Sequence, residues 1–130
     1  MKRLLTGLGI LLLVLIFSIL PASTFMVKKG FQNPDKGWAA PAVLFGGRLR
    51  MRLQMYGSAG NILKKMLDTF PEHEKRDRLV YWVALCHEKS GNYRKAAQWY
   101  RRFIQAYPQH IWNDQAQRRL TTLEAQHEGV

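Results

Sequence analysis

The sequence predicts an all-α protein, because apolar residues recur at helical spacing and a pattern of 37 residues repeats along the chain. From Tyr93 to Tyr107, seven apolar side chains recur at steps of three, one, three, three, one and three, namely Tyr93, Ala96, Ala97, Tyr100, Phe103, Ile104 and Tyr107. This spacing places them in one stripe of a helix. In addition, no charged residue occurs between Leu4 and Val27. We therefore expect helical hairpins behind an amino-terminal membrane helix.

Length, charge and cysteine content limit what the protein can be. A chain of 130 residues has room for one small domain. Its net charge of +11 indicates acidic proteins, anionic lipid head groups or nucleic acid as partners, or else serves solubility alone. The single cysteine, Cys86, excludes an internal disulfide and a thiolate cluster for metal. We expect neither a cofactor nor a metal ion.

Residues 1–27 are predicted to form a transmembrane anchor, with residues 4–27 in the membrane. About 20 apolar residues suffice to cross a bilayer as a helix. The alternative is a cleaved secretory signal with Pro21-Ala22-Ser23 at its end, which would release a secreted protein. Leu20 argues against cleavage after Ala22, since signal cleavage sites carry small residues. A short amino-terminal segment with basic residues usually stays in the cytoplasm. We therefore expect a single-pass inner-membrane protein whose remaining chain lies outside the cytoplasm.

Residues 28–39 are expected to form a short linker. They contain two glycines and the turn signal Asn-Pro-Asp-Lys-Gly. The folded domain, residues 40–127, should therefore lie close to the membrane surface.

That domain is expected to contain two hairpins, residues 40–71 and 77–108. Shifting the chain by 37 residues aligns Tyr56 with Tyr93 and Pro71 with Pro108. The alternation of arginine with apolar residues in 48–53 favours a strand locally. The repeat register favours a helix, with Gly47 as the small residue that lets two helices approach. We predict the helix, because a lone strand would have no partner.

Residues 113–126 are predicted to form a capping helix. Ala116, Leu120 and Leu123 give it one narrow apolar stripe, as expected for the end of a stack of repeats. We expect Asn113 or Asp114 at its N-cap, where a short acceptor satisfies free backbone donors. The domain would then hold about 2.5 repeats.

The central hairpin resembles a tetratricopeptide repeat. The resemblance lies in small Ala84, Gly91 and Ala96, followed by aromatic Tyr100 and terminal Pro108. The surrounding sequence resembles a bacterial cell-envelope subgroup, that of the outer-membrane assembly lipoprotein and the Tol–Pal-associated coordinator. This resemblance implies an α-solenoid of hairpins that acts as a protein-binding scaffold in the periplasm.

The resemblance also implies where a partner would bind, since the first helices of successive repeats line the concave face in this family. Carried onto this chain, these positions form a basic surface with an apolar floor, suited to an acidic peptide because arginine donates paired hydrogen bonds to carboxylates. Solvated surface charges are the alternative. The predicted partner-binding residues are Leu44, Arg48, Met51, Arg52, Arg78, Tyr81, Leu85, Lys89, Arg118 and Thr122.

Other functions fit the sequence less well. His87-Glu88 begins like a zinc-protease motif, but Gly91 replaces the second histidine. With no other catalytic set, we do not expect an enzyme. The arginines and lysines could bind nucleic acid, which a chain outside the cytoplasm would rarely meet, or anionic lipid head groups. A protein partner is the first expectation, and a second copy of the chain is also a candidate.

Overall fold

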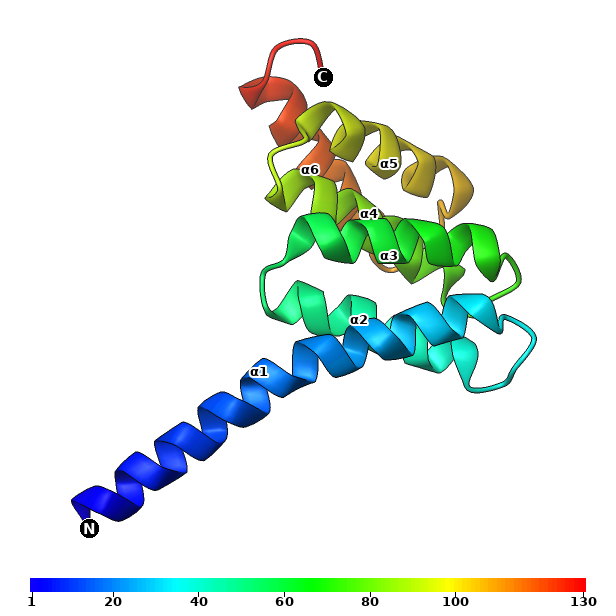
Figure 1. The fold of residues 1–130 in the computed structure, drawn as a ribbon. Coiled ribbons are helices and arrows are strands. Elements are labelled where there is room, and N and C mark those ends of the chain that lie inside the picture. Colours follow the sequence, from blue (N-terminus) through cyan, green and yellow to red (C-terminus); the bar gives the residue numbers. More distant parts are fainter.

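The computed structural model describes residues 1–130, which form six helices and no strand (Figure 1). The all-α prediction is confirmed, and the segment with alternating arginines is helical, as the repeat register predicted. Each helix packs on the next one in the sequence. The helices are α1 (Lys2–Gln32), α2 (Ala39–Arg52), α3 (Tyr56–Thr69), α4 (Arg76–Lys89), α5 (Tyr93–Ala106) and α6 (Asn113–Gln126).

The helix boundaries follow the 37-residue period. Helices α2, α4 and α6 each have 14 residues and begin 37 residues apart, and α3 and α5 are spaced in the same way. The expected hairpins 40–71 and 77–108 thus correspond to α2–α3 and α4–α5. The expected capping helix 113–126 is α6.

The structure differs from the sequence analysis at residues 28–39, which do not form a linker throughout. Helix α1 continues without interruption past the apolar segment and ends at Gln32, 37 residues before the end of α3. Its buried residues Ser23, Val27 and Gly30 face α2. The last turns of α1 therefore occupy the position of a second hairpin helix in the repeat that precedes α2.

The turn after α1 has the geometry of the two later inter-repeat turns. The last helix positions are followed by Asn33, Phe70 and Tyr107, whose φ and ψ angles are −128° and 60°, −123° and 67°, and −129° and 62°. Each of the three is followed by a proline, which restricts the backbone of the residue before it. Each also accepts a hydrogen bond from the amide three residues later, at 3.1 Å. The repeat thus includes the last turns of α1.

The core lies between the two helices of each hairpin and between neighbouring hairpins. Its largest fully buried side chains include Leu63, Met66, Leu79, Tyr100 and Phe103. Fully burying a side chain of this kind contributes about 1.5–3 kcal/mol. Four of these five side chains lie on α3 and α5, and Tyr100 and Phe103 belong to the apolar stripe recognised between Tyr93 and Tyr107.

Small residues allow the first three helices to approach closely. A Cβ atom on Gly47 would lie 2.8 Å from Cδ2 of Leu63 on α3. A Cβ atom on Gly46, the neighbouring residue of α2, would overlap the Cγ2 atom of Val27 on α1. The prediction that Gly47 permits close helix packing is confirmed, and Gly46 has the same role toward α1.

The start of α6 differs from the expected capping. Its N-cap residue is Trp112, and no side chain caps the helix. Asn113 is already helical and buried, and its amide donates hydrogen bonds to the carbonyls of Ile104 (3.3 Å) and Tyr107 (3.1 Å). Asn113 therefore satisfies free carbonyls at the end of α5 instead of free amides at the start of α6.

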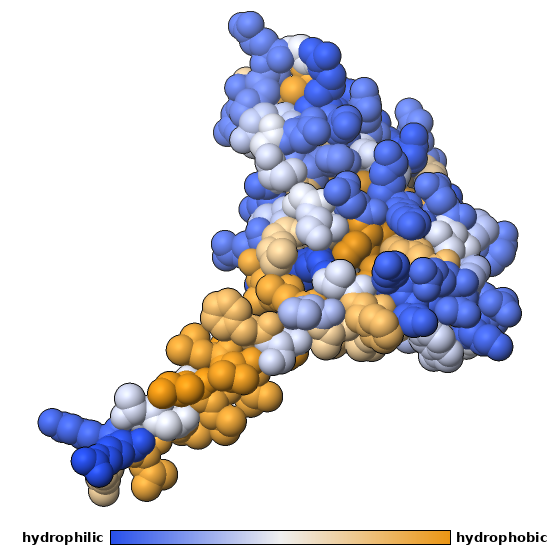
Figure 2. Space-filling view, viewed as in Figure 1, coloured by the Kyte–Doolittle hydropathy of each residue, from blue (hydrophilic) through white to orange (hydrophobic).

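The amino-terminal part of α1 stands clear of the other helices (Figure 1). It is long and apolar enough to cross a membrane, and none of its most apolar 18-residue window is buried in the fold. The surface is hydrophobic along this part of α1 and largely hydrophilic over the hairpins (Figure 2).

Candidate binding surface

The ten residues predicted to bind a partner lie on α2, α4 and α6, the first helices of the repeats. They do not form one uniform surface. Six of them are exposed, Met51 and Leu85 are half-buried, and Leu44 and Tyr81 are buried. The exposed six are Arg48, Arg52, Arg78, Lys89, Arg118 and Thr122.

Tyr81 is part of the core and is not a ligand-facing residue. Its ring packs edge-on against Tyr100 and Phe103, with centroid distances of 5.8 and 5.5 Å. Its hydroxyl is buried without a hydrogen-bond partner, and burial raises its pKa. Leu44 is only 8% exposed. Both positions face the neighbouring helices, which the repeat register alone could not reveal.

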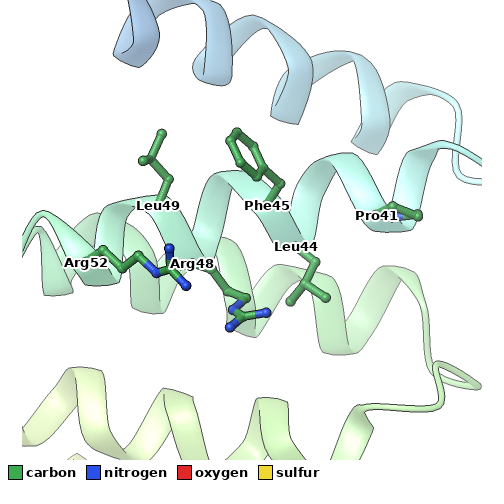
Figure 3. Close-up of a pocket in the computed structure, with 6 residues that line it drawn as sticks. All are labelled: Pro41, Leu44, Phe45, Arg48, Leu49 and Arg52. Carbon is green, nitrogen blue, oxygen red and sulfur yellow. The ribbon is translucent and has the colours of Figure 1, made fainter. Parts of the chain in front are cut away.

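Along α2, a hollow of about 270 Å³ contains two of the predicted arginines. Arg48 and Arg52 lie on one side of it together with Leu44, while Phe45 and Leu49 point toward α1 (Figure 3). Phe45 is 53% exposed, which is unusual for a large aromatic side chain in a packed helix. The hollow therefore combines two guanidinium groups with an exposed apolar surface.

Sequence reasoning missed three of the residues that line this hollow: Pro41, Phe45 and Leu49. The signal that could have found them is their helical spacing of four residues, which places them on one face. Pro41 is the equivalent of Arg78, so the repeat register could also have identified it, whereas Phe45 and Leu49 are equivalent to Trp82 and Cys86, which were not assigned to the concave face.

Arg48 also connects the first hairpin with the second. The guanidinium carbon of Arg48 lies 5.5 Å from the centroid of the Trp82 ring on α4. Arg78 makes a similar contact with Trp112, at 5.9 Å. A guanidinium stacked on an aromatic ring keeps its N–H donors at the edge. These contacts hold the two arginines in place and leave their hydrogen-bonding groups free.

The arginines of α2 have no acidic partner within the chain. The ion pairs of the structure join Arg101 to Glu124, His110 to Asp77, and Arg119 to Glu88. None of them involves Arg48 or Arg52. The hollow along α2 is therefore a site of uncompensated positive charge.

Arg118 and Thr122 both line two further hollows at α6, one of which also contains Glu88. There the Arg119 guanidinium donates a hydrogen bond of 2.6 Å to the Glu88 carboxylate. A fixed carboxylate beside Arg118 lowers the positive potential at this end. The structure thus divides the single basic groove of the sequence analysis into a cationic hollow at α2 and a mixed-charge region between α4 and α6.

No group of three or more His, Cys, Asp or Glu side chains is placed to hold a metal ion. Cys86 is buried, and burial raises the pKa of its thiol to about 12. The Nδ1 atoms of His73 and His110 accept hydrogen bonds from the backbone amides of Lys75 (3.0 Å) and Trp112 (2.9 Å). The two histidines thus stabilise equivalent inter-repeat turns.

Comparison with models of known protein families gave no match, and a search of curated proteins found no relative of this chain. Evidence for a function therefore comes from the residues themselves and their arrangement.

Proposed function

We propose that this protein is a membrane-anchored scaffold of tetratricopeptide-like hairpins that binds an acidic segment of a partner protein at α2. The observation that carries the proposal is the hollow in which Arg48 and Arg52, without acidic partners, lie beside the exposed Phe45. The chain has no catalytic role in this proposal and serves to hold a partner near the membrane.

The chemistry of the hollow suits a peptide with a carboxylate and an apolar residue close together. An arginine fork donates two parallel hydrogen bonds to a carboxylate, which gives both affinity and orientation. Aromatic and arginine side chains contribute most of the binding energy in many protein interfaces. A peptide that pairs with Arg48 and covers Phe45 would gain both the hydrogen bonds to its carboxylate and the apolar contact with the aromatic ring.

The repeat architecture supports the same reading. Tandem helical hairpins usually present extended surfaces to protein partners, and the 37-residue period here extends from α1 to α6. We further propose that the hairpins lie outside the cytoplasm, at the inner membrane. A reporter fused to the carboxyl terminus would decide this point, since cytoplasmic activity of the fusion would contradict it.

A charge-reversal pull-down tests the binding proposal. The full-length tagged protein would be solubilised from its native membrane as wild type, as Arg48→Glu/Arg52→Glu, and as the matched control Lys64→Glu/Lys95→Glu. The control changes the same charge on exposed positions of α3 and α5. We expect the partner to be lost only from the arginine variant. Equal recovery with all three proteins would refute the proposed site.

A further inference from the structure

We infer that a groove between α1 and α3 binds the phosphate group of an anionic phospholipid, through Arg50, Lys28 and Lys65. The groove has a volume of about 500 Å³, and α2 contributes Arg50 to it. Helices α1 and α3 lie on the same side of α2 (Figure 1). This site is separate from the hollow proposed to bind a partner protein.

Arg50 is a buried cation without a counterion. It is only 5% exposed. Its guanidinium donates hydrogen bonds to Ser23 Oγ (3.3 Å), Thr24 Oγ1 (2.7 Å) and the Gly46 carbonyl (3.0 Å), all of which are neutral oxygens. A guanidinium has five N–H groups, so about two remain for a ligand. Because an uncompensated buried charge is costly, an anion in the groove would stabilise this arrangement.

Two lysines complete the basic lining. Lys28 belongs to α1, and Lys65 belongs to α3, where its Nζ atom lies 4.6 Å from the centroid of the Phe31 ring. No acidic residue lines the groove. Val27 and Ile62 give it apolar walls, so it can accept a charged group together with the start of an acyl chain.

The position of the groove along α1 selects a lipid over a soluble anion. A helix rises 1.5 Å per residue, so the twenty residues from Leu4 to Ser23 span about 30 Å, the thickness of the hydrocarbon core. Thr24 and Lys28 therefore follow at the level of the head groups. A phospholipid beside α1 would bring its phosphate to Arg50 and its acyl chains along the exposed apolar surface of the anchor.

The groove is specific to the first repeat and is not a general property of the hairpins. One period later, Asp68 stands at the position of Phe31, and His87 stands at the position of Arg50. An aspartate there would repel a phosphate, and the apolar surface contributed by Phe31 is lost. The lipid-binding chemistry thus occurs where the chain leaves the membrane.

Native mass spectrometry of the full-length protein in detergent tests this inference, with phosphatidylglycerol and phosphatidylcholine as probes. The variant Lys28→Gln/Lys65→Gln removes two exposed charges from the groove and leaves Arg50 in the fold. The control is Lys64→Gln/Lys95→Gln, whose positions correspond to Val27 and Ser58 one repeat farther from α1. Because binding is read in detergent without a protein partner, the result is independent of the proposed function.

We expect the wild type and the control to retain phosphatidylglycerol in preference to phosphatidylcholine. The groove variant should bind phosphatidylglycerol roughly 10- to 30-fold more weakly, given about 1 kcal/mol for each lysine. Equal binding of the two lipids, or an equal loss in both variants, would overturn the site. Displacement of the lipid by an equal concentration of glycerol phosphate would assign the groove to a soluble phosphate instead.

Discussion

Gln54 and Gly91 occupy the same position in the turns between α2 and α3 and between α4 and α5. Both have a left-handed backbone, with φ of 60° for Gln54 and 84° for Gly91. Glycine adopts this conformation without a steric penalty, whereas a residue with a Cβ atom loses about 1–2 kcal/mol. The backbone of Gln54 is therefore strained in the first turn, whereas Gly91 adopts the equivalent conformation in the second turn without strain.

This comparison predicts that Gln54→Gly stabilises the protein. We expect the free energy of unfolding to rise by about 1 kcal/mol, and to fall by a similar amount in the reciprocal variant Gly91→Gln. Urea denaturation of the full-length protein in detergent, followed by circular dichroism, measures both changes. A loss of stability in Gln54→Gly would show that the glutamine side chain has an undetected stabilising role.

His87, half-buried in α4, predicts a pH dependence of stability. Burial, together with the charges of Lys95 and Lys64, lowers its pKa below the ordinary value of 6.5. The unfolded chain thus binds this proton more tightly than the folded chain. The contribution of the neutral imidazole is complete above pH 6.5 and is lost as the pH falls through the folded pKa.

The variant His87→Gln should remove this part of the acid destabilisation. We expect the difference in unfolding free energy between pH 8 and pH 5 to be smaller in the variant than in the wild type. Denaturation at the two pH values measures this difference for each protein. Both proteins carry the same carboxyl groups, so the contribution of these groups cancels when the wild type and the variant are compared. An identical pH dependence in both proteins would contradict the predicted pKa shift.

The packing of α1 on α2 depends on Gly30. A Cβ atom at this position would lie 2.6 Å from Cγ2 of Val43 and 3.0 Å from the carbonyl oxygen of Ala39. The carbonyl belongs to the backbone and cannot move aside without shifting the start of α2. Helix α1 and the hairpins are therefore joined by close contact between helices, in addition to their connection through the chain.

We predict that Gly30→Ala lowers the free energy of unfolding by about 1–3 kcal/mol through overpacking, although alanine favours helices. The matched control is Gly9→Ala, because no atom lies within 4 Å of a Cβ at Gly9. Thermal unfolding in detergent would compare the two. If both variants were equally stable, α1 and α2 would not be packed as described.

Much of this arrangement of helices could be predicted from the sequence, because the 37-residue period and the apolar stripes both depend on local spacing. The end of α1 could not be predicted from the sequence in this way. Lys28 and Lys29 mark the end of the apolar segment, and their charge alone predicts that the helix ends there as well. Charge ends a membrane span, whereas a helix ends where its hydrogen bonding is interrupted, here at the Asn33-Pro34 turn.

The candidate site was predicted less completely than the fold. The register correctly placed Arg48 and Arg52 on an exposed face of α2, but it assigned Tyr81 and Leu44 to the same surface although both are buried. It also gave no sign that Glu88 pairs with Arg119 beside Arg118. Side chains at equivalent positions of successive repeats point the same way from their helices. Their exposure, however, depends on the side chains of the neighbouring helices.

For the molecule as a whole, α1 is a helix long and apolar enough to cross a membrane, and its last turns form the first element of the repeated helices. Helix α2 is the first hairpin helix packed against it. In our account, this arrangement presents the α2 hollow to a protein partner and the α1–α3 groove to lipid head groups.

The most direct test of this account is photocrosslinking in the native membrane from a photoreactive amino acid at Phe45. We predict an adduct with a protein whose crosslinked segment is acidic, and its loss in the Arg48→Glu/Arg52→Glu background. The same amino acid at Ile111, which is 87% exposed in the turn between α5 and α6, serves as the control. Adducts with lipid alone, or the same protein adduct from Ile111, would contradict the proposed binding surface.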